Sequence, residues 1–312
     1  MMTMPPVTSF SRYIPLAIGL IILLIIALLA PWEQIEELLE NVPFTILLAL
    51  FGLSLVYYAA KTLRFWYILH LLNISANLKT VSLLYLSGQP FSLLPAGELY
   101  RTVLLKKHLG ISISKSSPSV TIQGLVEAIV LIALSLIGAL FIGENTLAVG
   151  GVGVLLIILI IALQRGWLSK TYSLVGKLPY VSISQKKFQD FIQSHREILA
   201  PKPLFILIAF SLVPVISGVG ILYLSSKAIG FNIGFVESMI GYSLPVILSG
   251  LSFLPGGLGV SEGGSIGILQ LFGASAAGAI AITLLVRIFT LVAGLFYGII
   301  AQLILHSRKI LS

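Results

Sequence analysis

Two ionisable residues stand alone in long apolar stretches, where an isolated charge is energetically costly. Glu127 lies about ten residues into its stretch and Arg287 about thirteen residues into a longer one. A helix rises 1.5 Å per residue, which places Glu127 roughly 15 Å deep. Charges at that depth are expensive, and they are usually paired or line a pathway. We expect Glu127 and Arg287 to form an intramembrane charge pair. The alternative is separate polar partners, such as Gln123 or Thr290.

Two short strings, Ser92–Gly97 and Ser252–Gly257, share the pattern S-x-L-P-x-G. After the first string, Glu98 and Arg101 are three residues apart, a spacing that places them on one face of a helix. Proline and glycine end the incoming segment, and the next helix begins with unpaired amide groups. We expect Glu98 and Arg101 to bind a lipid headgroup, with Arg101 on a phosphate. The alternative is an ion pair that only stabilises the turn.

The second string opens a glycine-rich run, Pro255–Gly264. Glycines permit close approach and offer backbone amides to an anionic group. The run lacks the G-x-x-x-x-G-K-[ST] pattern, and it fails G-x-G-x-x-G because Glu262 stands at the third glycine position. The substrate-binding residues expected here are Gly256, Gly257, Gly259 and Glu262. The alternative is a structural hairpin tip in which Glu262 caps the following helix.

The remaining polar residues suggest no catalytic chemistry. The chain has no cysteine, which excludes disulfides and thiolate sites, and it has only one aspartate and four histidines. We expect no catalytic residue, no metal site and no cofactor, and we expect the histidines, including His195, to lie on the surface. Lys61 and Arg64, beside Trp66 and Tyr67, fit a belt of snorkelling side chains at the membrane interface.

Membrane helices must position all of these residues. The chain is 57% hydrophobic and 10% charged, with a mean hydropathy of +1.07. Soluble chains average about 45–50% apolar and roughly 25% charged residues, so a water-soluble enzyme is excluded. The net charge of +8 indicates cytoplasmic loops and anionic headgroups, and no nucleic-acid partner is expected.

A crossing helix needs about 20 largely apolar residues. Six stretches are expected to cross: 13–31, 43–61, 118–142, 147–163, 203–229 and 274–305. Glycine and proline interrupt two others, 78–94 and 236–254, which we expect to enter and return on the same side. This arrangement gathers seventeen of the nineteen Lys and Arg residues on one side. The positive-inside rule makes that side cytoplasmic, and both termini lie there.

The predicted fold class is an all-α polytopic membrane protein, with about six crossing helices and two re-entrant helical hairpins arranged as inverted repeats. We expect a single integral membrane domain, 1–312, with repeats 43–142 and 203–305 joined by 143–202. Within that connection, 166–202 is expected to be a cytoplasmic linker. Paired interrupted segments at matching positions point to the midplane site of a transporter.

The strings Leu94–Arg101 and Leu254–Gly263 resemble the two hallmark strings of the lysylphosphatidylglycerol synthase transmembrane-region family. The likeness extends from about Pro43 to Leu305. It implies translocation of a lipid or a lipid-linked glycan. Full-length family enzymes also have a cytosolic domain that attaches lysine from its tRNA. Because the sequence stops at Ser312, directly after the last span, we expect no such domain and no transferase activity.

From this resemblance we expect a multi-pass flippase or transporter in the cell (cytoplasmic) membrane. It would move an anionic, aminoacylated or polyprenyl-linked lipid between leaflets. The alternative is a membrane subunit or partner of a lipid-modifying transferase. The expected partners are membrane lipids with an anionic or lipid-linked headgroup and, under the alternative, a separate transferase.

Overall fold

The computed structural model describes residues 14–94, 97–142, 191, 193–195, 197–252 and 254–310, and the secondary structure there is helical throughout. Four described helices are long and apolar enough to cross a membrane. These are α3 (Phe44–Leu71), α6 (Ile113–Ile142), α10 (Pro201–Ala228) and a continuous helix composed of α13 (Ala276–Arg287), the π-helical η5 (Ile288–Val292) and α14 (Ala293–Ile310). The predicted all-α polytopic membrane fold is confirmed.

The first predicted crossing is bent. Helix α1 (Ile14–Leu29) is followed by α2 (Trp32–Glu40), and the two helices meet at 85°. Pro31 stands at the bend and has no amide hydrogen to continue the helix. Helix α2 is amphipathic, with Ile35 buried and most of its glutamates exposed. The bent pair makes a fifth span if it is counted as one. The predicted crossing 147–163 lies outside the described residues, as does most of the linker 166–202.

Both interrupted stretches fold into hairpins of two helices. In the first, α4 (Leu78–Ser87) leads through η2 (Gln89–Leu93) and η3 (Gly97–Leu99) to α5 (Tyr100–Leu109). In the second, α11 (Phe235–Leu251) leads through η4 (Pro255–Gly257) to α12 (Val260–Leu271). The two helices of each hairpin contact each other, and η2 contacts η4. The two interrupted tips therefore meet inside the molecule.

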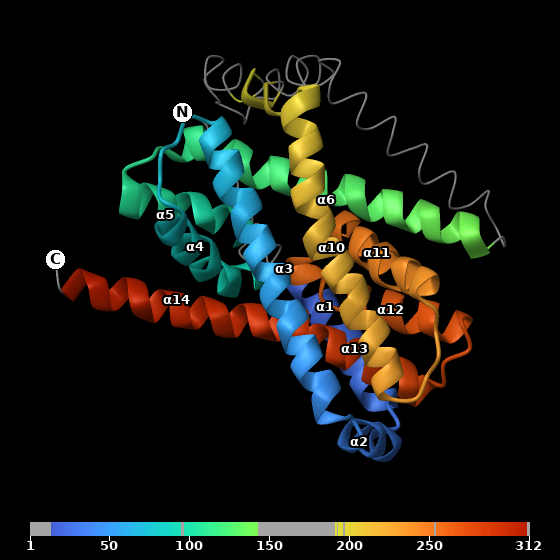
Figure 1. Cartoon of the computed structure of the whole chain (residues 1–312). Coiled ribbons are helices and arrows are strands. Elements are labelled where there is room, and N and C mark those ends of the chain that lie inside the picture. The colour runs from blue at the N-terminus through green and yellow to red at the C-terminus, as the bar shows by residue number, and fades with distance from the viewer. Residues whose placement is uncertain are drawn as a thin grey trace, which may run out of the picture.

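Helices α3 and α10 form the centre of the molecule (Figure 1). They pack side by side and run in opposite directions, with the first hairpin beside one of them and the second hairpin beside the other. Helix α14 extends past the first hairpin and contacts α4 and η2. Both central helices have 28 residues, and a hairpin and a long helix follow each of them in the same order. The inverted repeats and their boundaries stay a prediction.

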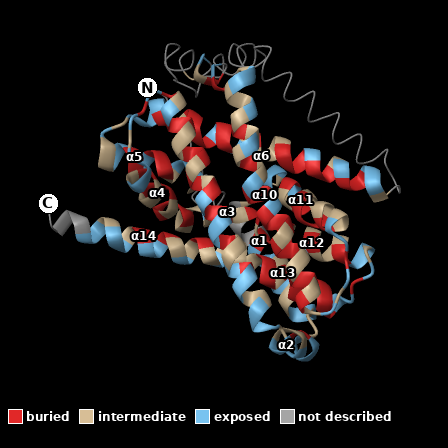
Figure 2. Cartoon of the chain, in the orientation of Figure 1, coloured by how far each residue is buried: buried red, intermediate tan, exposed pale blue. Residues whose placement is uncertain are grey.

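The core divides between the two hairpins. One apolar cluster joins α10, α11, α6 and α13, and another joins α3, α4, α5 and the first half of α6. Figure 2 shows the buried residues concentrated where these helices cross, with exposed residues along α14 and on α2. Many exposed side chains are large and apolar, such as Leu28, Phe141 and Leu303. Such a surface suits a protein surrounded by lipid.

Candidate functional site

At the tip of the first hairpin, between η2 and η3, the chain makes a sharp and closely packed turn. A Cβ atom on Gly97 would lie 1.5 Å from the carbonyl oxygen of Phe91, so only glycine fits there. The Phe91 ring stacks on Tyr100, with the ring centroids 3.7 Å apart. Pro95 and Ala96, part of the predicted tip, lie outside the described residues. The turn brings Arg101, in the first turn of α5, back against Gly88.

Arg101 is buried in this tip. Its side chain is 3% exposed, and a Cβ atom on Gly88 would lie only 2.6 Å from its Cγ. The guanidinium lies over the Tyr85 ring, 4.3 Å from the centroid. Its Nε and Nη1 atoms have no hydrogen-bond partner within the described part of the chain. The nearest carboxylate, Glu98, is 3.9 Å from Nη1, and its side chain is 56% exposed. Arg101 is thus a buried cation whose carboxylate contact among the described residues, with Glu98, is distant and solvated.

Two further buried groups flank Gly88. The Oγ of Ser87 and the Nε2 of Gln89 are both buried, and neither has a hydrogen-bond partner among the described residues. Buried polar groups are nearly always hydrogen-bonded, and an unsatisfied one costs about 1–3 kcal/mol. Both residues are chain neighbours of Gly88, against which Arg101 packs. The group that would satisfy the unpartnered Nε and Nη1 of Arg101 is an oxyanion, such as a phosphate, which arginine binds well.

Glu127 belongs to a different ion cluster from the one we predicted. Its Oε1 is 2.8 Å from Lys61 Nζ, and its Oε2 accepts a hydrogen bond of 2.5 Å from Arg64 Nη2. Arg64 also donates to Ser211 Oγ at 2.8 Å, and its side chain is 0% exposed. The predicted pair of Glu127 with Arg287 is therefore wrong. The interfacial belt is also wrong for Lys61 and Arg64, because α3 carries both side chains into the contact between α3, α6 and α10.

Arg287 pairs with Glu262 instead. Its Nε is 2.6 Å from Glu262 Oε1, because α12 and α13 pack against each other. The other carboxylate oxygen of Glu262 accepts the Gly259 amide at 2.7 Å, so Glu262 caps α12 as the alternative proposed. A substrate role for Gly256, Gly257, Gly259 and Glu262 stays a prediction, but the Gly259 amide already has an acceptor.

A protein-family model described as Lysylphosphatidylglycerol synthase TM region matches residues 14–298. The match covers most of the 312 residues and includes both hairpins. The chain belongs to this family. No curated protein matches it. Membership in the lysylphosphatidylglycerol synthase TM family indicates a lipid-related function in a membrane.

In this member of the family, two buried tyrosines make hydrogen bonds between helices that are distant in the sequence. Tyr85, under the Arg101 guanidinium, accepts a hydrogen bond of 3.0 Å from Gln123 Nε2. Tyr58 donates to the carbonyl oxygen of Thr290 in the π-helical turn. Tyr58 and Tyr85 were not predicted from the sequence, although tyrosines inside apolar helices are a usable signal, because a buried hydroxyl needs a partner.

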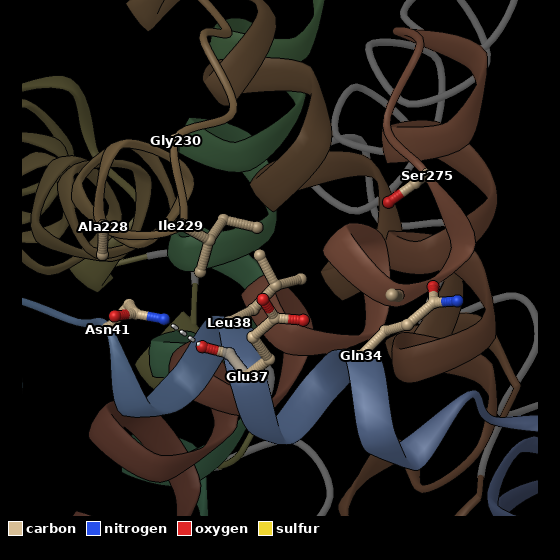
Figure 3. A pocket seen from close by; sticks show the side chains of 9 residues that line it. Gln34, Glu37, Leu38, Asn41, Ala228, Ile229, Gly230 and Ser275 are labelled. Atoms are coloured by element: carbon tan, nitrogen blue, oxygen red, sulfur yellow. Dashed lines mark hydrogen bonds between the residues drawn. The ribbon is translucent and has the colours of Figure 1, made fainter.

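A separate pocket of about 470 Å³ lies between α2, the end of α10 and the start of α13. In Figure 3, Gln34 and Glu37 of α2 and Asn41, which follows that helix, border it opposite Ile229 and Ser275. Asn41 Nδ2 donates to the Glu37 carbonyl oxygen at 2.7 Å. None of the residues that line this pocket is basic, so it does not suit an anionic headgroup.

The surface prediction is wrong for His195, which is 8% exposed. Its Nδ1 lies 2.8 Å from the Phe191 carbonyl oxygen, and its Nε2 lies 2.8 Å from Thr121 Oγ1 of α6. Burial lowers the pKa of this imidazole below its ordinary value. His195 therefore attaches the segment before α10 to the start of α6 as a neutral side chain.

Proposed function

We propose that this chain moves a lipid with an anionic headgroup between the leaflets of the cell membrane, and that Arg101 holds the headgroup. The observation that carries the proposal is the Arg101 guanidinium, buried without a hydrogen bond among the described residues. A charge within a membrane is costly, and such residues mark substrate pathways more often than they serve packing. A ligand oxyanion would supply the missing acceptor.

A comparison of the two buried arginines of the first half supports this role. Arg64 has a carboxylate at 2.5 Å and a serine hydroxyl at 2.8 Å, which is the arrangement of a structural ion pair. Arg101 has an aromatic ring beneath it and a solvated carboxylate at 3.9 Å. The chain therefore supplies Arg64 with a carboxylate and a hydroxyl and leaves only its Nε without a partner among the described residues, whereas both Nε and Nη1 of Arg101 lack one there.

The meeting of the two hairpin tips suggests the route. The first tip contacts the second through η2 and η4, and a Cβ atom on Gly256 would be 3.0 Å from Leu93. Non-helical backbone at membrane depth is tolerated where it is buried in protein or lines a wet cavity. The headgroup would pass between the tips while the acyl chains stay in the bilayer. The repeated order of elements and the opposite directions of α3 and α10 favour rocking of one half against the other.

The experiment is transport in liposomes that contain the purified protein. Headgroup-labelled lipids of three classes are incorporated separately: anionic, aminoacylated and polyprenyl-linked. A quencher added outside reports how fast the label crosses. We expect at least one class to cross faster than in protein-free vesicles. If none does, the proposal fails. If a lipid binds at Arg101 but does not cross, the role of a partner for a separate lipid-modifying transferase takes its place.

A further inference from the structure

We infer that the lipid held at Arg101 carries a dianionic headgroup, a phosphate monoester or a diphosphate, and that Lys61 is its second cationic ligand. This inference rests on the proposed function and deepens it. A monoanionic phosphodiester would satisfy Arg101 alone, whereas a dianion would also engage the ion cluster between α3 and α6.

The buried charges of α3, α5 and α6 favour a dianionic ligand over a monoanionic one. Among the described residues, the interior cluster comprises three cations, Lys61, Arg64 and Arg101, and one carboxylate, Glu127. Glu98 is more than half exposed, so water screens its charge. The cluster thus has an excess of two positive charges. Buried charges are stable only when they are paired, and a dianionic ligand supplies the balance.

Lys61 is the cation that Glu127 can release. Arg64 is fully buried and tied to Ser211, and it balances Glu127 without help. Lys61 is 15% exposed and lies 4.4 Å from the Tyr57 ring, on a flexible stem that can turn toward a ligand. When Lys61 moves, the carboxylate keeps its partner, so no buried charge is left alone.

Lys61 and Arg101 share one neighbourhood. Arg101 lies over the Tyr85 ring, and the Tyr85 hydroxyl accepts a hydrogen bond from Gln123, four residues before Glu127 on α6. Glu127 is the carboxylate that Lys61 contacts at 2.8 Å, so about one helical turn of α6 separates the neighbours of Arg101 from those of Lys61. A phosphate monoester offers three terminal oxygens, which suits the unpartnered donors of Arg101 together with Lys61.

The test compares two lipids with the same acyl chains, phosphatidic acid and phosphatidylglycerol, by competitive binding to the full chain in detergent. At about pH 8.5 the monoester is a dianion, because the second phosphate pKa is about 6. We expect phosphatidic acid to bind at least about tenfold tighter. Lys61→Met should reduce this preference to about twofold without changing the affinity for phosphatidylglycerol. Lys61→Arg should restore it. Lys106→Met, an exposed lysine of α5, is the matched control.

The possible results distinguish a failure of the dianion inference from a failure of the proposed lipid transport. Equal binding of both lipids, lost together in Arg101→Met, overturns the dianion and leaves the proposed function standing. An equal fall in both affinities in Lys61→Met would show that Lys61 only supports the fold, which also overturns the inference. If neither lipid binds the unaltered chain, the anion site itself fails.

Discussion

Replacement of Glu127 by glutamine should destabilise the protein strongly. The change leaves Arg64, whose side chain is 0% exposed, with Ser211 as its one remaining partner among the described residues, and it also frees Lys61. Breaking a buried ion pair by removing one partner costs about 3–5 kcal/mol, because an uncompensated buried charge remains. Arg101→Met breaks no hydrogen bond in the described part of the chain, so the same reasoning gives it a change of less than about 1 kcal/mol.

The assay is equilibrium unfolding in mixed micelles with a double-mutant cycle. Glu127→Gln and Arg64→Met should couple by about 2–3 kcal/mol, near the upper end for residues in direct contact. Glu127→Gln and Arg287→Met are the matched control, because Arg287 pairs with Glu262 in a different cluster. Those two changes should add to within about 0.5 kcal/mol.

The reverse pattern would refute the reasoning. Additive effects of Glu127→Gln and Arg64→Met, together with strong coupling between Glu127→Gln and Arg287→Met, would mean that the charges of the two halves face each other. The contacts of α3 with α6 would then be wrong. The conclusions that Arg64 forms a structural ion pair and that Arg101 binds a ligand would be wrong as well.

Three more outcomes follow from single contacts. Gly97→Ala should disrupt the first tip and abolish lipid binding, because its Cβ would overlap a carbonyl oxygen, whereas Gly124→Ala, with open space around it, should not. Glu262→Ala should lower the free energy of unfolding by about 3–5 kcal/mol, because it removes the cap on α12 and also the carboxylate of the largely buried Arg287, and Glu262→Gln, which keeps a cap oxygen, should lower it less. Because burial lowers the pKa of His195, the unfolded chain takes up this proton first as the pH falls. Stability should therefore be complete above about pH 6.5 and decline below it, and His195→Asn should remove that decline in unfolding experiments at several pH values.

The hairpins could be predicted from the sequence because local chemistry decides them. In the first hairpin, α4 ends before Gly88 and Pro90, and in the second the chain turns at Pro255–Gly257, after α11 has continued through Pro245. The burial of Arg101 was not foreseen, because it depends on the close approach of α5 to Gly88. That approach depends on the whole tip.

The partner of Glu127 could not be predicted, because it depends on which helices pack together. The isolation of Glu127 and Arg287 in long apolar stretches suggested a pair, but each residue finds its partner on a neighbouring helix of its own half. The predicted span ended at Lys61, whereas α3 continues to Leu71. Arg64 therefore lies within the helix and not at its edge. The three-residue spacing of Lys61 and Arg64, which gives them one face, was the signal for a shared partner.

The most direct test of the central claim is the rate at which a labelled anionic headgroup crosses liposomes that contain Arg101→Met, measured beside the unaltered chain. A lost hydrogen bond to a charged group is worth about 1.5–3 kcal/mol, so transport should fall by roughly tenfold or more while stability is retained. Lys106→Met should transport at the unaltered rate. If Arg101→Met folds normally and transports as fast as the unaltered chain, Arg101 does not hold the headgroup, and the account is contradicted.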